Sequence, residues 1–93
     1  MRVSWRRRAL SDAVGAYAYL EVDSATAAAA LRTALRDTAD SLSTFPSRGR
    51  LGRMPGTREL LVGGTLYILI FEVRPQGVRI LRVLHSSRRY PAD

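Results

Sequence analysis

The spacing of apolar residues divides the chain into a helical half followed by a β half. In residues 7–20, apolar side chains recur every three or four positions, as on one face of an amphipathic helix. Residues 25–42 show the same spacing, and Ser24 stands before them as a candidate helix cap. The few residues between these segments predict an antiparallel pair of helices. Upstream, the alternating residues 2–5 predict a short strand.

The rest of the chain predicts a three-stranded antiparallel sheet. RELLV (58–62) and TLYILIFEV (65–73) flank Gly63-Gly64, a pair typical of a two-residue hairpin. A second turn, at residues 74–77, leads into VRILRVLH (78–85). The middle segment is apolar on both faces, so we expect it to be the central strand. Before the sheet lies a stretch rich in glycine, proline and arginine, residues 46–56, which we expect to be a functional loop.

If both turns are tight, they determine which residues pair across the strands. Val62 then faces Thr65, and Glu72 faces Arg79 as a cross-strand ion pair. One face, expected to pack on the helices, carries Arg58, Leu60, Val62, Tyr67, Leu69, Phe71, Ile80, Arg82 and Leu84. The opposite face carries Glu59, Leu61, Leu66, Ile68, Ile70, Glu72, Arg79, Leu81, Val83 and His85.

Composition limits the chemistry and the compartment. The chain has 93 residues, 46% of them hydrophobic, which suits a single α+β domain spanning residues 1–93. It has no cysteine, so disulfides and thiolate chemistry are excluded and the cytoplasm is the simplest compartment. No apolar run approaches the roughly 18 residues of a membrane span, and the basic N-terminus lacks the apolar stretch of a signal peptide. We expect no membrane partner, no metal and no other cofactor.

The net charge of +7 lies almost entirely in the second half of the chain, and every basic residue is arginine. Residues 1–45 hold six arginines and five acidic residues, whereas residues 46–93 hold nine arginines and three acidic residues. Arginine binds phosphate and carboxylate groups through a planar, bidentate fork. We therefore expect an anionic partner, such as nucleic acid, the ribosome or an acidic protein. The arginines expected to contact it are Arg48, Arg50, Arg53, Arg58, Arg82, Arg88 and Arg89. The run Arg6–Arg8 is instead expected to be a solvated helix start, although arginine sits poorly against the helix dipole there.

Four segments, in order and with matching spacing, resemble the RelE/ParE superfamily of bacterial toxins. VSWRRRALSDAVGAYAYL (3–20) is similar to the family's first strand and helix, and GRLGRMPGTRELLV (49–62) to its glycine–arginine stretch and second strand. YILIFEV (67–73) resembles its central strand, and ILRVLHSSRRYP (80–91) its last strand and basic tail. The resemblance implies an α+β fold of the order β-α-α-β-β-β with a basic C-terminal tail. It also implies the growth-inhibiting toxin of a type II toxin–antitoxin system.

Such a toxin has a cognate antitoxin, encoded by the adjacent gene, that neutralises it in a hetero-oligomeric complex. An antitoxin segment that folds on binding needs apolar area to offset the entropy it loses. We expect this area on the exposed sheet face and along the helix hairpin, at Leu61, Ile68, Leu31 and Leu35.

The resemblance leaves two routes of toxicity open. ParE-like members inhibit DNA gyrase, whereas RelE-like members cut mRNA on the ribosome without a metal, which requires a base, an acid and cations. The positions that match basic residues of RelE are Glu59, Leu61 and Ile68, and two of these cannot carry charge. The sequence therefore favours gyrase inhibition. A third hypothesis is an inactive toxin retained as an antitoxin-binding, DNA-corepressing module.

If the protein is a nuclease, its catalytic residues are expected to be Glu59, His85 and Tyr90. Glu59 would serve as the base, and His85, the one histidine, suits acid–base chemistry. The predicted register places their Cα atoms roughly 12 Å apart on one face of the sheet, so they could act together only across a bound substrate.

Overall fold

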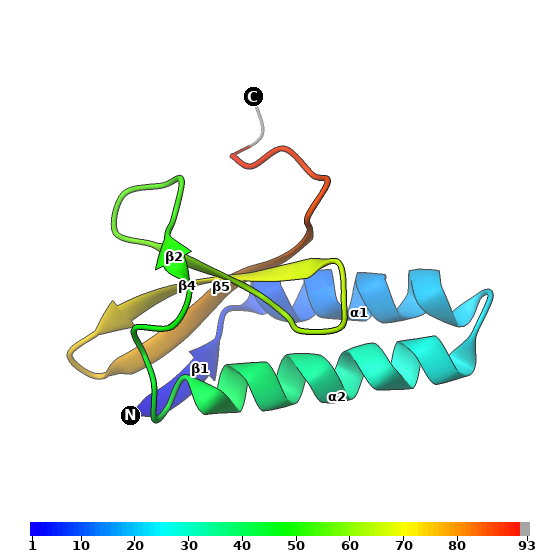
Figure 1. Ribbon diagram of the computed structural model, residues 1–93, viewed down its shortest axis with the longest axis horizontal. Coiled ribbons are helices and arrows are strands. Elements are labelled where there is room, and N and C mark those ends of the chain that lie inside the picture. Colours follow the sequence, from blue (N-terminus) through cyan, green and yellow to red (C-terminus); the bar gives the residue numbers. More distant parts are fainter. Residues whose placement is uncertain (92–93) are drawn as a thin grey trace.

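A computed structural model describes residues 1–91 and shows a helical layer packed on a sheet (Figure 1). The elements follow in the order β1 (Arg2–Trp5), α1 (Arg7–Glu21), α2 (Ala25–Ser41), β2 (Arg50–Leu51), β3 (Arg58–Leu61), β4 (Tyr67–Arg74) and β5 (Gly77–His85). Below the sheet in Figure 1, α1 and α2 run antiparallel, as the sequence predicts. The 46–56 loop and the C-terminal tail lie on the opposite side, which we call the open face.

The helices form where the apolar spacing predicts them, each within one residue at its end. The Ser24 hydroxyl caps α2 by accepting a hydrogen bond from the backbone N–H of Ala27 at 3.0 Å. The buried face of α1 consists of small alanines, so this helix lies close to its neighbours. The core between the layers includes Leu31, Leu35, Leu42, Val62, Leu69, Phe71, Val78, Ile80 and Val83. No helix within residues 1–91 is long and apolar enough to cross a bilayer.

The sheet has five strands in the order β1-β5-β4-β3-β2, with β4 in the predicted central position. The three antiparallel strands β3, β4 and β5 are as predicted, and Glu72 pairs with Arg79 across the strands, although its ion pair is made with Arg74 and not with Arg79. Two edge strands complete the sheet: β1 pairs with β5 in parallel, and β2 forms inside the predicted loop. The chain therefore builds its sheet from both ends of the sequence.

The β3–β4 hairpin has a longer turn than Gly63-Gly64 predicts. The backbone N–H of Val62 donates to the carbonyl of Tyr67 at 2.9 Å, so four residues, 63–66, form the turn. The Thr65 hydroxyl closes it by donating to the Val62 carbonyl at 2.8 Å and accepting from the Tyr67 N–H at 3.0 Å. The predicted pairing of Val62 with Thr65 is wrong by two residues. A two-residue shift leaves every side chain on its predicted face, because side chains alternate with period two.

A β-bulge in β5 has a larger effect. Phe71 of β4 pairs with Ile80, but the preceding residue Ile70 pairs with Arg82, which leaves Leu81 as the extra residue. Such a bulge reverses the inside–outside alternation of all residues that follow it in the strand. The strand beyond the bulge is thus turned over relative to the prediction.

Because of this reversal, the side chains at the end of β5 that are predicted on the helical side lie on the open face, and those predicted on the open face lie on the helical side. Val83 packs in the core and His85 faces the helical side, whereas both are predicted on the opposite side. Arg82 and Leu84 are predicted to face the helices, yet their pairing places them on the open face. The register prediction is therefore wrong for residues 82–85.

Candidate functional site

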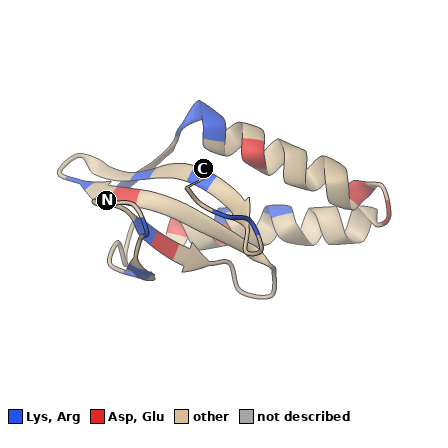
Figure 2. Cartoon of the chain, turned by 90° about the horizontal axis from the view of Figure 1, so that it is seen from above, with Lys and Arg blue, Asp and Glu red and all other residues tan. Residues whose placement is uncertain are grey.

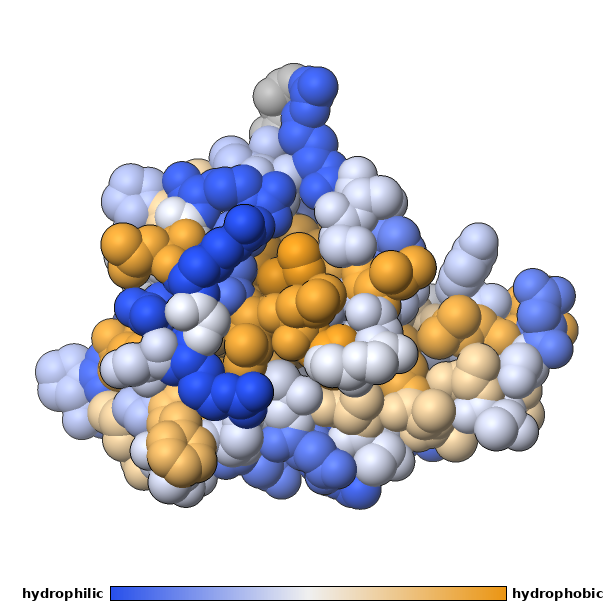
Figure 3. Space-filling view, in the orientation of Figure 1, coloured by the Kyte–Doolittle hydropathy of each residue, from blue (hydrophilic) through white to orange (hydrophobic). Residues whose placement is uncertain are grey.

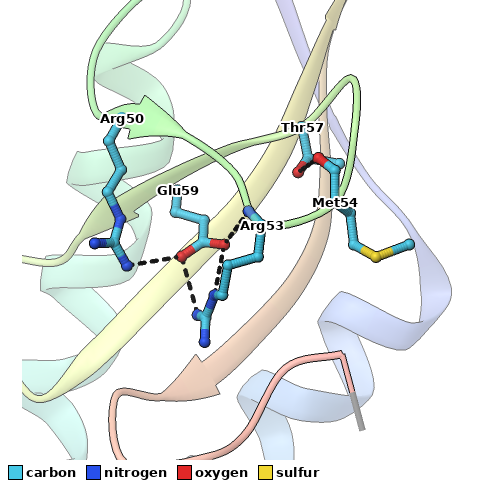
Figure 4. Close-up of polar contacts among 5 residues, drawn as sticks. All are labelled: Arg50, Arg53, Met54, Thr57 and Glu59. Atoms are coloured by element: carbon cyan, nitrogen blue, oxygen red, sulfur yellow. Dashed lines mark hydrogen bonds and ion pairs between the residues drawn. The ribbon is translucent and has the colours of Figure 1, made fainter. Parts of the chain in front are cut away.

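Glu59 of β3 is a buried carboxylate that anchors the arginine-rich loop to the open face (Figure 4). Only 2% of the residue is exposed. Its Oε2 accepts hydrogen bonds from the backbone N–H and the Nε of Arg53, both at 3.0 Å. Its Oε1 accepts from Nη2 of Arg53 at 2.9 Å and from Nη2 of Arg50 at 3.2 Å. These contacts, chiefly the side-chain bonds from Arg53, lower the pKa of Glu59 from 4.5 to about 2.

The loop owes its path to further contacts with the backbone. Gly49 has a φ of +85°, and a Cβ there would lie 2.3 Å from the backbone oxygen of Glu59, so the loop can approach β3 this closely only at a glycine. The guanidinium of Arg58 donates to the carbonyls of Ser47 at 2.8 Å and Gly49 at 3.3 Å. Arg53 and Arg58, both predicted as anion contacts, are thus occupied in holding the loop.

Arg82 is also held within the fold. Its Nε and Nη2 donate to the carboxylate of Asp12 on α1 at 2.8 and 3.2 Å, and the same carboxylate accepts the backbone N–H of Val83 at 3.0 Å. Both side chains are largely buried, and the hydrogen bond that Arg82 donates to the Asp12 carboxylate raises the pKa of Arg82. Asp12 therefore joins α1 to the stretch of β5 that β1 does not cover.

His85 and Glu59 lie on opposite faces of the sheet. The pairing of Tyr67 with His85 places the histidine on the helical side, where its ring meets the Tyr67 ring edge-on with centroids 5.4 Å apart. The Nδ1 of His85 accepts the backbone N–H of Ser87 at 3.1 Å. The prediction that these two residues share a face is wrong, because the bulge at Leu81 turns the end of β5 over.

The C-terminal tail brings Tyr90 to the Glu59 side of the sheet. The Tyr90 ring lies 5.8 Å from Cζ of Arg53, within range of a cation–π contact. Arg88 and Arg89 are exposed in the same tail. The structure thus brings Tyr90 and Glu59 to one arginine and leaves His85 apart from both. Within residues 1–91, no group of three histidine or acidic side chains is placed to hold a metal ion.

Two apolar depressions are lined by residues of the β3–β4 hairpin, and apolar surface in this region is visible in Figure 3. The first, about 490 Å³, lies on the open face and includes Leu61 and Ile68, which pair across β3 and β4. The second, about 630 Å³, lies between the helix hairpin and the β3–β4 turn. Its apolar lining includes Tyr19, Leu20, Leu31, Ala34, Leu66 and Tyr67.

The four residues predicted to contact an antitoxin differ in accessibility. Leu61 is 56% exposed and Ile68 is partly exposed. Leu31 and Leu35 are only 2% and 1% exposed, because they pack in the core between helices and sheet. Leu31 still contributes to the floor of the second depression, whereas Leu35 serves packing.

Sequence reasoning missed a cluster of arginines at the start of α1, visible in Figure 2 as the blue beginning of that helix. Arg6, Arg7 and Arg8 line a depression together with Arg82 of β5 and Arg88 of the tail. The local sequence shows the three consecutive arginines. Only the parallel pairing of β1 with β5 brings the other two beside them.

The arrangement of elements defines the fold class. A structure titled "Chromosomal ParDE TA system from P. aeruginosa" superposes with a TM-score of 0.79 at 23% sequence identity. The match covers 91% of this chain and 95% of that one. The protein therefore shares the α+β fold of that structure, as its sequence predicts.

Sequence comparisons identify the family within that class. The family described as "ParE toxin of type II toxin-antitoxin system, parDE" matches residues 3–90. The protein Y4kP of Sinorhizobium fredii is 36% identical over 92 residues, covering 97% of this chain and 93% of its own length. Toxin RelE2 of Caulobacter vibrioides is 36% identical over 87 residues, covering 94% and 97%. The chain belongs to the ParE toxin family of type II toxin–antitoxin systems.

Proposed function

We propose that this toxin stops growth by binding and inhibiting DNA gyrase in the cytoplasm, and that it does not cleave mRNA. The observation that supports this proposal is the separation of Glu59 from His85 by the sheet. RNA cleavage requires a base and an acid that reach the same phosphodiester. A carboxylate with a pKa of about 2, held by two arginines, is also a weak base at neutral pH. Inhibition through protein contact requires neither group.

The purified toxin is expected to inhibit supercoiling of relaxed plasmid DNA by gyrase. Primer extension on a reporter mRNA from induced cells is expected to show no codon-positioned cuts. Such cuts, without any effect on gyrase, would establish the mRNA endonuclease as the correct function. If the toxin affects neither gyrase nor mRNA and growth continues, the third hypothesis, an inactive antitoxin-binding module, replaces both.

His85→Gln provides a variant that separates the two active hypotheses. Loss of a general acid or base lowers catalysis by about 10²–10⁴-fold, so a nuclease that depends on His85 would lose both cleavage and toxicity. A gyrase inhibitor acts by protein contact and needs no acid or base at this position, so it is expected to retain toxicity.

We further propose that an antitoxin encoded by the adjacent gene covers both apolar depressions in a hetero-oligomeric complex. Tyr67 and Ile68 are consecutive residues of β4 that line the two depressions, so one partner chain that wraps the β3–β4 hairpin reaches both. Exposed apolar surface of this kind gives a folding partner segment the area it needs. Arg50, at the edge of the first depression, would complement an acidic residue of that segment.

Leu61→Arg is expected to weaken antitoxin binding at least tenfold, about 1.4 kcal/mol, because a charged side chain would then occupy the apolar centre of the interface. Titration calorimetry with the purified antitoxin measures the change. Leu10→Arg is the matched control, because Leu10 on α1 is 51% exposed and lines neither depression. Equal weakening by both variants would place the antitoxin elsewhere.

A further inference from the structure

The arginines at the start of α1 form a positive surface for which residues 1–91 supply no free counter-charge. Arg6, Arg7, Arg8 and Arg88 are exposed around a shallow depression of about 650 Å³, with Arg82 beneath them. Within residues 1–91, the guanidinium groups of the four exposed arginines make no hydrogen bond or ion pair. The carboxylate in the depression, Asp12, is already bound to Arg82 and to the backbone N–H of Val83.

This placement opposes the stability of the helix. The first turn of α1 contains no acidic residue, and Arg6 at the N-cap position makes no side-chain capping bond. Cations near a helix N-terminus are unfavourable, because the helix dipole is positive there. Like-charged side chains crowded in one depression also repel one another. An external anion would relieve both effects at once.

The lining of the depression identifies the chemistry of that anion. The side chains around it are Arg6, Arg7, Arg8, Ser11, Asp12, Arg82 and Arg88. None of these is apolar, whereas a peptide that docks stably needs apolar anchors. A nucleic-acid backbone needs none, because neutralised phosphates release counterions and thereby supply the binding free energy. Arginine also matches phosphate oxygens with two parallel donors.

We propose that this arginine cluster binds the phosphodiester backbone of nucleic acid without reading its sequence. A second group of arginines extends this positive surface. Arg2 lies at the other end of β1, roughly 13 Å from Arg6 at about 3.3 Å per strand residue, and lines a further depression with Arg74 and Arg79. A backbone that follows β1 would therefore contact both groups. This site is separate from the apolar antitoxin surface and does not depend on the proposed inhibition of gyrase.

Fluorescence anisotropy with a labelled DNA duplex and a labelled RNA of the same length tests the proposal. The purified toxin is titrated at several salt concentrations between about 50 and 200 mM. Arg7→Gln/Arg8→Gln removes two of the clustered charges from exposed side chains, and Arg32→Gln/Arg36→Gln removes two exposed charges from α2 as a control. Thermal melting of each variant verifies that the fold is intact.

The cluster variant is expected to bind at least about tenfold more weakly at the lowest salt and to lower the slope of log K against log salt by about 2, one for each lost phosphate contact. The control is expected to keep the wild-type slope.

Equal binding of the DNA and RNA probes indicates a site for the phosphodiester backbone that they share, and tighter binding of one probe identifies that nucleic acid as the preferred ligand. Three results would overturn the proposal: no binding to either probe, equal loss in the control variant, or competition by polyglutamate as effective as that by DNA of equal charge. A supercoiling assay separates this proposal from the proposed function. If the cluster variant still inhibits gyrase, a failure to bind nucleic acid contradicts the site alone and not the inhibition of gyrase.

Discussion

Glu59→Gln is expected to lower the free energy of unfolding by about 3 kcal/mol at pH 6 and by far less at pH 2. The pKa of Glu59 is lowered from 4.5 to about 2 in the folded protein, and each unit of pKa shift corresponds to about 1.4 kcal/mol. A lowered pKa stabilises the fold above the unfolded-state pKa, and the stabilisation is lost as the pH falls from about 4.5 to about 2. Glutamine has no charge to titrate, so the variant lacks this contribution at every pH. Urea unfolding of both proteins between pH 2 and 7 measures the difference.

Glu72→Gln is the matched control for this experiment. Glu72 forms an ion pair with Arg74 at 2.7 Å, but Arg74 is half exposed and the carboxylate is partly so. Exposed ion pairs contribute about 0–1 kcal/mol, and the control should therefore change stability little. A wild-type protein whose advantage over Glu59→Gln stays constant from pH 6 to pH 2 would show that the carboxylate does not stabilise the loop through its charge.

Asp12→Ala is expected to lower the free energy of unfolding by about 3 kcal/mol. The substitution leaves the largely buried guanidinium of Arg82 without its partner and the backbone N–H of Val83 without an acceptor. Removing one member of a buried pair costs about 3–5 kcal/mol, whereas replacing both members by apolar residues is often neutral. We therefore expect Asp12→Ala/Arg82→Met to recover most of the lost stability, as measured by urea unfolding.

Asp37→Ala provides the comparison for Asp12, because its contact with Arg36 is exposed on both sides and spans 3.9 Å. It is expected to change stability by less than about 0.5 kcal/mol. If the Asp12 and Asp37 variants are equally stable, or if the double variant is no more stable than Asp12→Ala alone, the proposed role of Asp12 in joining α1 to β5 is wrong.

The sequence predicted the order of elements well, because that order depends on local spacing. The period of the apolar residues defined both helices to within one residue at their ends. The apolar β4 was correctly placed at the centre of the sheet, and the turn at residues 74–77 gave the correct pairing of Glu72 with Arg79. Where a contact joins neighbouring segments through a short turn, local sequence is sufficient.

Contacts between distant segments were not predictable in the same way. The sequence of β5 carries one sign of the bulge, because two consecutive apolar residues, Ile80 and Leu81, interrupt its apolar–polar alternation, but the pairing of Ile70 with Arg82 is seen only in the folded sheet. The Thr65 side chain, rather than the two glycines, determines the length of the β3–β4 turn. One extra residue at the bulge was enough to separate His85 from Glu59.

The candidate site was predicted in composition better than in arrangement. Leu61 and Ile68 are adjacent and accessible as expected. The arginines of the 46–56 loop were expected to face an external anion, yet Arg53 is occupied by Glu59 within the chain. An isolated sequence shows which side chains carry charge, but their partners depend on the three-dimensional path of the loop.

The parallel pairing of β1 with β5 governs when the toxin can complete its fold during synthesis. Arg2 pairs with Gly77 and Trp5 with Ile80, so the first strand finds its partner only after about 75 further residues have been made. At roughly 5–20 residues per second, that interval is roughly 4 to 15 seconds. Until then β1 lacks its neighbour and the arginine cluster at the start of α1 is not assembled. This surface is therefore the last part of the fold to be completed, because it also needs Arg82 and Arg88 from the end of the chain.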